Sequence, residues 1–257
     1  MKDKHLIVDD LDIRYTEQGE GPVVLLLHGW GTNLETFNEL LTELEGKSVR
    51  FVSLDLPGFG KSEAPKEEWD ISRYVKFVRA FLDKLSIDNP HVVIGHSFGG
   101  RIAIKAVASN LIKPERLVLI ASAGTAKSRS FRNALFAVIA KTGKIVSFVP
   151  PFCFFRKIFR DKLYKVAGAT DYLNAGKMKD TFLKIIHENL TDDARAITAL
   201  TLLIWGEKDT ETPLAEACIL KDAISGSVLE ILPDAGHFAH QCQARAVAEK
   251  ISQFAKL

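Results

Sequence analysis

Residues 91–100 of the chain read HVVIGHSFGG, an apolar run followed by a serine and two further glycines. The run up to Gly95 predicts a buried β-strand, and the helical spacing that begins at Phe98 predicts a helix. A Gly-x-Ser-x-Gly sequence between a strand and a helix is typical of a sharp turn that exposes the serine hydroxyl. The glycines leave room for neighbouring backbone, and the positive end of the helix dipole faces the serine. The pattern therefore predicts that Ser97 is a nucleophile, with an ordinary tight turn as the alternative.

Apolar runs of strand length recur on both sides of this turn. Together with residues 91–95 they occupy residues 23–27, 50–54, 116–121, 202–206 and 228–232. They are rich in Val, Leu and Ile without polar alternation, which is typical of strands buried on both faces of a parallel sheet. Predicted helices lie between or after them, at residues 71–85, 98–109, 214–224 and 245–254. The chain is therefore predicted to be an α/β protein, a mostly parallel sheet flanked by helices. Two extended segments, 6–8 and 11–17, predict an antiparallel edge.

One segment breaks this alternation. Residues 125–195 read as helical, contain Pro150-Pro151 and include no convincing strand. They fall between two predicted strands of the same sheet, so we interpret them as an inserted helical lid over one end of it. The predicted domains are a core of residues 1–124 and 196–257 and a lid of residues 125–195.

Composition narrows the class of protein. The 257 residues are 47% hydrophobic and 26% charged, close to the globular average, and the formal net charge is only +2. A dedicated nucleic-acid binder usually has a strongly basic balance, so that class is not expected. Three cysteines without a CxxC pair argue against a disulfide framework or a zinc site. The sequence shows neither an apolar signal region near Met1 nor a run of about 18 apolar residues, which predicts a cytoplasmic protein without a transmembrane helix.

A serine nucleophile needs a general base and a carboxylate that orients the base. In proteins with this turn both residues follow the serine, the acid first. His237 lies in a glycine-containing loop after the last predicted strand and is the predicted base, with His240 as a local competitor. Asp209 follows the preceding strand and is the predicted acid. Glu207 and Glu211 are alternatives, and Glu211 is also a candidate cap of the next helix.

The developing negative charge on a substrate carbonyl needs two backbone N–H donors. One is predicted to come from Phe98, the residue after the nucleophile. The other is predicted to come from Trp30, because glycines on either side let its backbone approach a substrate closely. His28, in the same loop, is interpreted as a buried residue that braces the loop rather than as a second base.

These segments together resemble the α/β-hydrolase family. The motifs that carry the resemblance, in chain order, are His28-Gly29-Trp30-Gly31, Asp55-Leu56-Pro57-Gly58-Phe59-Gly60-Lys61-Ser62, Gly95 to Gly100, Trp205-Gly206-Glu207-Lys208-Asp209 and Gly236-His237. The resemblance covers nearly the whole chain outside the lid and implies the α/β-hydrolase fold. Within the family, position 97 distinguishes the chain from haloalkane dehalogenases and epoxide hydrolases, which use an aspartate nucleophile.

Two subgroups of the family are similar in particular loops. The segments 29–31 and 57–62 look like those of pimeloyl-carrier-protein methyl ester esterases, although those enzymes usually have Trp where this chain has His96. The carbon–carbon bond hydrolases of aromatic degradation are similar in layout. Their oxyanion loop usually carries a Gly-Pro-Gly element, which residues 28–33 lack.

The predicted lid has a distinctive charge. Between Thr125 and Lys165 there are one acid, Asp161, seven phenylalanines and ten basic residues, namely Lys127, Arg129, Arg132, Lys141, Lys144, Arg156, Lys157, Arg160, Lys162 and Lys165. One interpretation is a lid whose apolar side packs on the core while its lysines are solvated. The other is a docking surface for an acidic carrier protein or an anionic membrane surface.

Taken together, the residues predict a serine hydrolase that cleaves a carboxylic ester of short to medium acyl chain. Ser97, His237 and Asp209 would form the triad, and the predicted mechanism needs no metal or organic cofactor. The same groups would also serve a thioesterase or a carrier-protein-linked ester hydrolase. A carbon–carbon bond hydrolase and a slow-turnover ligand receptor are the remaining alternatives.

Overall fold

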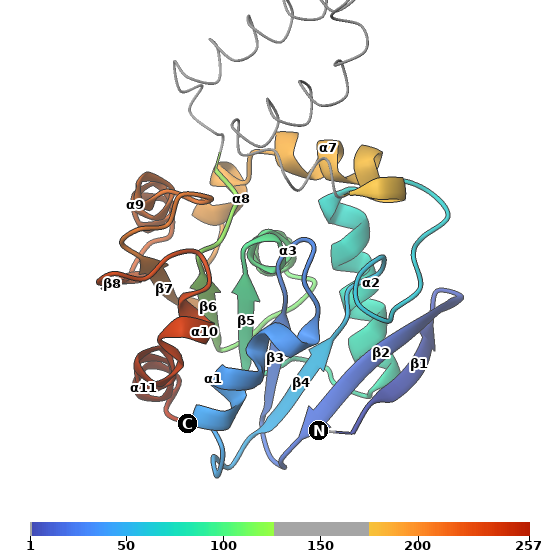
Figure 1. The fold of residues 1–257 in the computed structure, drawn as a ribbon, viewed down its shortest axis with the longest axis horizontal. Coiled ribbons are helices and arrows are strands. Elements are labelled where there is room, and N and C mark those ends of the chain that lie inside the picture. The colour runs from blue at the N-terminus through green and yellow to red at the C-terminus, as the bar shows by residue number, and fades with distance from the viewer. Residues whose placement is uncertain (1, 126–174) are drawn as a thin grey trace, which may run out of the picture.

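A single sheet organises the chain (Figure 1). The computed structural model describes residues 2–125 and 175–257, and within them the sheet has eight strands in the order β1-β2-β4-β3-β5-β6-β7-β8. The strands are β1 (Lys4–Val8), β2 (Leu11–Gln18), β3 (Val23–Leu27), β4 (Arg50–Leu54), β5 (Val92–His96), β6 (Arg116–Ile120), β7 (Leu200–Gly206) and β8 (Val228–Leu232). Pairing is antiparallel from β1 to β2 and from β2 to β4, and parallel from β4 through to β8. The predicted parallel sheet with an antiparallel edge is confirmed.

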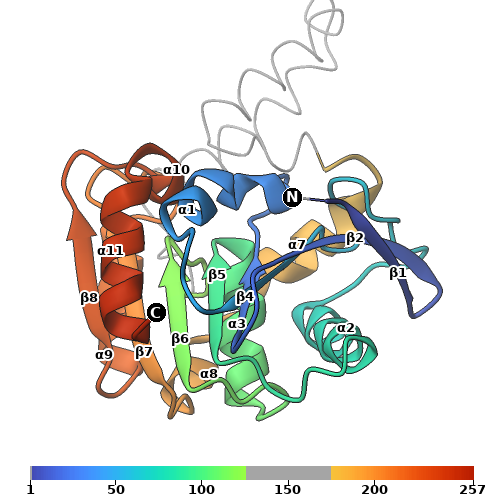
Figure 2. The same cartoon turned by 90° about the horizontal axis from the view of Figure 1, so that it is seen from below.

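Helices cover both faces of the sheet. One face packs against α2 (Ile71–Lys84), α3 (Phe98–Ala108), α8 (Thr191–Arg195) and α9 (Leu214–Ala223). The other packs against the 3-10 helix η1 (Leu34–Phe37) and against α1 (Asn38–Glu43), α10 (Ala239–Cys242) and α11 (Ala244–Ala255). Figure 2 shows α11 beside β7 and β8. Successive side chains of β3 alternate between the two cores, Leu25 and Leu27 in one and Val24 and Leu26 in the other. Burial on both faces explains why the strands read as continuous apolar runs.

The predicted element bounds agree closely with the structure. Three strands, β3, β4 and β8, have the predicted bounds, and the four predicted helices are each found within one residue at either end. Strand β5 runs one residue further than predicted, to His96, which pairs with Ile120 of β6. The apolar pattern stops at Gly95 because His96 is polar, yet its backbone continues the ladder. Strand β7 begins two residues earlier, at Leu200.

Two helices lie beyond the carboxyl ends of the central strands. These are the 3-10 helix η3 (Gly176–Met178) and α7 (Lys179–His187) (Figure 1). They belong to the C-terminal part of the predicted lid. Most of that segment, including Pro150-Pro151 and the ten basic residues between Thr125 and Lys165, lies outside the described residues. The lid boundaries and the docking surface therefore stay predictions. Within the described residues no helix is long and apolar enough to cross a membrane.

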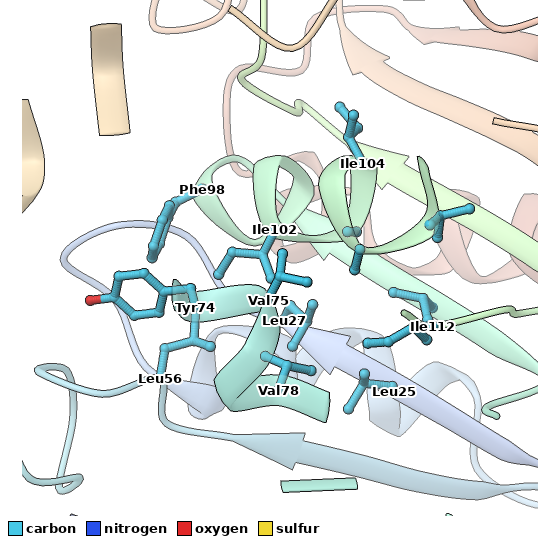
Figure 3. Close-up of a cluster of buried hydrophobic side chains, with 14 of the residues drawn as sticks. Leu25, Leu27, Leu56, Tyr74, Val75, Val78, Phe98, Ile102, Ile104 and Ile112 are labelled. Atoms are coloured by element: carbon cyan, nitrogen blue, oxygen red, sulfur yellow. The ribbon is translucent and has the colours of Figure 1, made fainter. Parts of the chain in front are cut away.

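The N-terminal end of α3 is held by aromatic packing. Figure 3 shows Phe98 of α3 beside Tyr74 of α2, and their ring centroids are 5.0 Å apart in an edge-to-face arrangement. The hydroxyl of Tyr74 donates a hydrogen bond to the carbonyl of Pro57, 3.0 Å away. Both rings are buried, which adds their apolar area to the core. The start of α3 is thereby fixed relative to α2 and to the loop after β4.

Gly99 marks the closest approach of α3 to the sheet. A Cβ atom at this position would lie 2.0 Å from the carbonyl oxygen of Leu27 and 2.4 Å from its carbon. Both atoms are backbone, so no side chain can rotate away. We expect Gly99→Ala to lower the free energy of unfolding by about 3 kcal/mol or more. Urea unfolding would measure the loss. Gly236→Ala is the control, because a Cβ there meets nothing within 4 Å. An equal effect of the two substitutions would contradict this account.

Candidate active site

Ser97 occupies a strained turn between β5 and α3. Its φ and ψ are 50° and −109°, a combination that non-glycine residues rarely adopt. Hydrogen bonds hold the turn: the Ser97 carbonyl accepts from Gly100 N at 3.1 Å and from Ala123 N at 3.2 Å, and Ser97 N donates to Ile120 O at 3.1 Å. Such strain typically costs about 1–3 kcal/mol and persists only where the surroundings enforce it. The structure therefore has the sharp strand-to-helix turn predicted from the glycine pattern.

Asp209 and His237 meet at the same end of the sheet. Asp209 follows β7 and His237 follows β8, and Asp209 Oδ2 lies 2.9 Å from His237 Nδ1. Their side chains are 0% and 6% exposed. Asp209 also accepts hydrogen bonds from the backbone N–H groups of Glu211 and Thr212 and from the hydroxyl of Thr212. The two residues predicted as acid and base therefore form a buried hydrogen-bonded pair.

The charge state of Asp209 determines the histidine tautomer. Burial of the Asp209 carboxyl opposes its ionisation, but the hydrogen bond and charge of His237 and the hydrogen bonds from Thr212 outweigh burial and lower its pKa. An ionised carboxylate can only accept, so the hydrogen of the shared bond belongs to Nδ1 of His237. In the neutral form of the ring, Nε2 of His237 is then the unprotonated nitrogen, as a general base requires.

Ser97 and His237 both line a cavity of about 450 Å³. The described residues around it come mainly from loops at the carboxyl ends of parallel strands, where ligands of α/β proteins usually bind. They are Gly29, Trp30, Gly31, Thr32, Gly58, Phe59, Gly60, His96, Ser97, Ala175, Met178, Glu211, His237 and Phe238. Three of the predicted site residues, Ser97, His237 and Trp30, thus share one cavity. Asp209 lies behind His237.

The predicted oxyanion donors are neighbours. Trp30 lines the cavity, and its ring lies 5.5 Å from that of Phe98. Phe98 is the first residue of α3, so its N–H has no acceptor within the helix. The indole of Trp30 also contacts Phe59 and Phe182, at centroid distances of 4.8 and 5.0 Å. The aromatic cluster holds the Trp30 loop against α3 and α7, and the oxyanion role of both amides stays a prediction.

His28 is confirmed as a buried bracing residue. Its Nε2 accepts a hydrogen bond from Leu56 N at 2.9 Å, which leaves Nδ1 to donate to Gly29 O at 2.7 Å. Burial lowers its pKa to about 4, so the ring is neutral at physiological pH. The histidine ties the loop after β3 to the loop after β4.

The competing carboxylates have other positions. Glu207 accepts from Asp234 N, at 3.3 Å, rather than pairing with His237. The prediction that Glu211 caps the following helix is wrong, since Pro213 is the N-cap of α9. The backbone N–H groups of Glu211 and Thr212 donate to Asp209 and hold the turn before α9. The Glu211 side chain does not cap α9 but lines the cavity. One of its oxygens is 3.5 Å from His237 Nε2.

The sequence did not predict a cluster of three histidine rings that pack against one another at a tilt. The ring of His96 lies 4.8 Å from that of His237 and 4.4 Å from that of His240. His96 Nε2 donates to the carbonyl of His237 at 3.1 Å, and His240 pairs with the hydroxyl of Thr36 at 3.2 Å. Both extra histidines are buried. In the sequence, His96 and His240 are marked only by lying close to the Ser97 and His237 motifs. The hydrogen bond from His96 to His237 joins residues about 140 positions apart in the chain. His96 therefore positions the backbone of the predicted base.

Buried histidines predict a loss of stability in acid. Burial lowers the pKa of His28 to about 4 and, together with the charge of His237, that of His240 to about 3, both from a usual 6.5. Burial also lowers the pKa of His96, again with nearby histidine charges contributing. As the pH falls below 6.5 the unfolded chain takes up protons that the native state does not, so stability falls with pH. Each histidine should contribute up to about 1.4 kcal/mol per pH unit near pH 5.

Urea unfolding between pH 7.5 and pH 5 would measure this slope. His240→Gln keeps a polar partner for Thr36. It should reduce the slope of unfolding free energy against pH by the contribution of about one proton. An unchanged slope in that variant would show that His240 does not contribute.

The fold and this site define a class of protein. The sequence profile of the alpha/beta hydrolase family matches residues 24–250, and the chain belongs to that family. Among its relatives is the AB hydrolase superfamily protein YisY of Bacillus subtilis, 26% identical over 92% of both chains. Another is a 2-hydroxy-6-oxononadienedioate/2-hydroxy-6-oxononatrienedioate hydrolase of Pseudomonas putida, 28% identical over 90% of this chain and 87% of its own. An esterase from Exiguobacterium antarcticum shares the fold, with a TM-score of 0.77 and 22% identity over 98% and 99% of the two chains.

The described residues contain no group of three or more His, Cys, Asp or Glu side chains arranged to hold a metal ion.

Proposed function

We propose that the protein is a serine hydrolase that cleaves a carboxylic ester of short to medium acyl chain through an acyl-enzyme. Ser97 is the nucleophile, His237 the general base and Asp209 the residue that orients the base. Membership of the alpha/beta hydrolase family supports hydrolysis in general. The ester substrate and the triad roles are this proposal's own content.

The observation that supports the proposal most directly is the buried hydrogen bond between Asp209 Oδ2 and His237 Nδ1, 2.9 Å long. It leaves Nε2 unprotonated on a ring that shares its cavity with Ser97. A serine hydroxyl is a weak nucleophile at neutral pH, and a base of this kind is what activates it. An ordinary loop-packing histidine would not need an ionised, fully buried carboxylate behind it.

The proposed reaction has two halves. His237 Nε2 accepts the proton of the Ser97 hydroxyl while Ser97 Oγ attacks the ester carbonyl. Asp209 stabilises the imidazolium, and the backbone N–H groups of Trp30 and Phe98 donate to the oxyanion. The imidazolium then protonates the departing alcohol, which leaves an acyl group on Ser97. A water molecule, deprotonated by His237, attacks the acyl-enzyme and releases the carboxylic acid.

A series of p-nitrophenyl esters from acetate to laurate tests this function, together with fluorophosphonate labelling located by mass spectrometry. We expect multiple turnover with an optimum in chain length, because a cavity of about 450 Å³ limits the acyl group. We also expect one label per chain, on Ser97. A label on another residue would contradict the proposal. A label on Ser97 without multiple turnover would favour the ligand receptor, and faster cleavage of matched thioesters would favour a thioesterase.

Carbon–carbon bond hydrolysis is the second candidate. The observation in its favour is the Pseudomonas putida relative, a hydrolase of an oxononadienedioate, which is 28% identical over most of both chains. Activity on such a vinylogous diketone above that on simple esters would establish this candidate instead.

A further inference from the structure

A carboxylate points into the proposed active site from the turn that carries Asp209. Glu211 lines the cavity, and its Oε2 lies 3.5 Å from His237 Nε2. That nitrogen is the one that must take the proton from Ser97 in the proposed reaction. The exposed fraction of the Glu211 side chain is 56%, so it reaches both the cavity and the solvent.

The position of Glu211 is tied to that of the triad. Its backbone N–H donates to Asp209 Oδ1 at 2.8 Å, and the next N–H, of Thr212, donates to the same oxygen at 3.0 Å. These bonds fix the backbone of the turn on both sides of the Glu211 side chain. The turn therefore holds residue 211 at the edge of the cavity, beside the proposed base.

Among the described residues that line the cavity, no cation accompanies this carboxylate. Glu211 is the only acid among these described residues, and none of them is lysine or arginine. The other lining residues are glycines, aromatic residues, one methionine, one alanine, one threonine, two histidines and Ser97, the proposed nucleophile. Within the described part of the chain, the contact of the Glu211 carboxylate with a basic group is the one with His237 Nε2, which is an ion pair only when His237 is protonated. The described wall of the cavity is therefore negative on the side of the base.

We propose that Glu211 makes this pocket select substrates that carry no negative charge beside the scissile bond. Two negative charges within about 7 Å of each other, in a partly solvated pocket, repel by an amount that lowers binding roughly tenfold. An uncharged ester does not meet this repulsion. The inference rests on the proposed function, since it names the substrate class of the same site. It also disfavours a dioate, such as the substrate named for the Pseudomonas putida relative.

A pair of esters of nearly equal shape tests the proposal. Methyl p-nitrophenyl succinate is uncharged, and mono-p-nitrophenyl succinate carries one carboxylate at the far end of the same acyl chain. We expect the wild-type protein to prefer the uncharged ester in kcat/KM, and Glu211→Gln to reduce that preference roughly tenfold. Glu211→Lys should reduce it further. The preference of the wild type should also fall at high salt, because salt screens exposed charges.

Glu249→Gln is the matched control. Glu249 lies on α11, outside this cavity, and its side chain is 59% exposed, close to the 56% of Glu211. The same charge is removed from the surface, but the preference for the uncharged ester should not change. An equal shift in both variants would mean that net charge, and not the position of Glu211, sets the preference. An unchanged preference in Glu211→Gln would also overturn the proposal.

Binding without turnover separates this proposal from the proposed function. The anilide analogues of the two succinates can be titrated by calorimetry, whether or not the protein hydrolyses esters. If Glu211→Gln tightens binding of the anionic anilide roughly tenfold relative to the uncharged one, charge selection holds even where ester turnover fails. If esters are turned over but neither preference shifts, charge selection fails and the proposed function stands.

Discussion

Replacing Ser97 with alanine is expected to lower kcat on p-nitrophenyl esters by roughly 10⁴–10⁶-fold. Alanine keeps the Cβ atom and can occupy the same turn, whose hydrogen bonds involve only backbone groups of residue 97. The substitution removes the attacking oxygen, so no acyl-enzyme can form. Urea unfolding should show a stability within about 0.5 kcal/mol of the wild type, because the change is small and outside the core.

Ser122→Ala is the control for this prediction. Ser122 follows β6 close to α3, and its hydroxyl donates to Ala123 O at 2.9 Å. Ser122 is buried and does not line the cavity, so we expect its loss to leave fluorophosphonate labelling intact. Adding His237→Ala to Ser97→Ala should cost little further activity, since residues of a triad act as a unit. A Ser97→Ala protein with the wild-type rate would overturn the proposed mechanism.

Asp209→Asn should lower kcat by roughly 10⁴-fold with the fold retained. The amide oxygen of asparagine can still accept from the N–H groups of Glu211 and Thr212, so the turn after β7 should persist. The amide nitrogen would replace Oδ2, and it can only donate. His237 would then carry its hydrogen on Nε2 instead of Nδ1, and could not accept the proton of Ser97.

Asp234→Asn provides the comparison. Asp234 is an exposed residue of the His237 loop that pairs with Lys208 at 2.6 Å, so the same chemical change is made beside the base without touching it. We expect less than a tenfold effect on kcat, since surface pairs contribute little. Equal losses of kcat in Asp209→Asn and Asp234→Asn would mean that the His237 loop, and not the tautomer of His237, determines the rate.

Much of the fold could be predicted because strands buried on both faces of a sheet read as continuous apolar runs in the sequence. Strand β3 is five consecutive Val and Leu residues that alternate between two cores, and its predicted bounds are those of the structure. The turn at Ser97 could be predicted for a steric reason, since only glycine fits where α3 meets Leu27. The approach of Asp209 to His237 followed from the parallel sheet, which brings loops after successive strands to one edge.

The side-chain environment of the site could not be predicted in the same way. From the sequence, Glu211 is an alternative acid of the triad or a cap of the next helix, whereas in the structure its N–H bonds to Asp209 and its side chain lines the cavity. The packing of the His96 ring against His237 and His240 depends on the path of the chain between β5 and the loop after β8. Neither contact has a local pattern, since each depends on packing between segments distant in the sequence.

The sheet order has a consequence for synthesis on the ribosome. Ser97 follows a central strand, whereas His237 follows the edge strand β8 and lies 140 residues later. Translation proceeds at roughly 5–20 residues per second, so the proposed base emerges on the order of ten seconds after the proposed nucleophile. A nascent chain can build the strained serine turn on β5 and β6 long before β8 pairs with β7. A nascent chain at that stage would have the turn without the proposed base, so the proposed hydrolysis could begin only after β8 has joined the sheet.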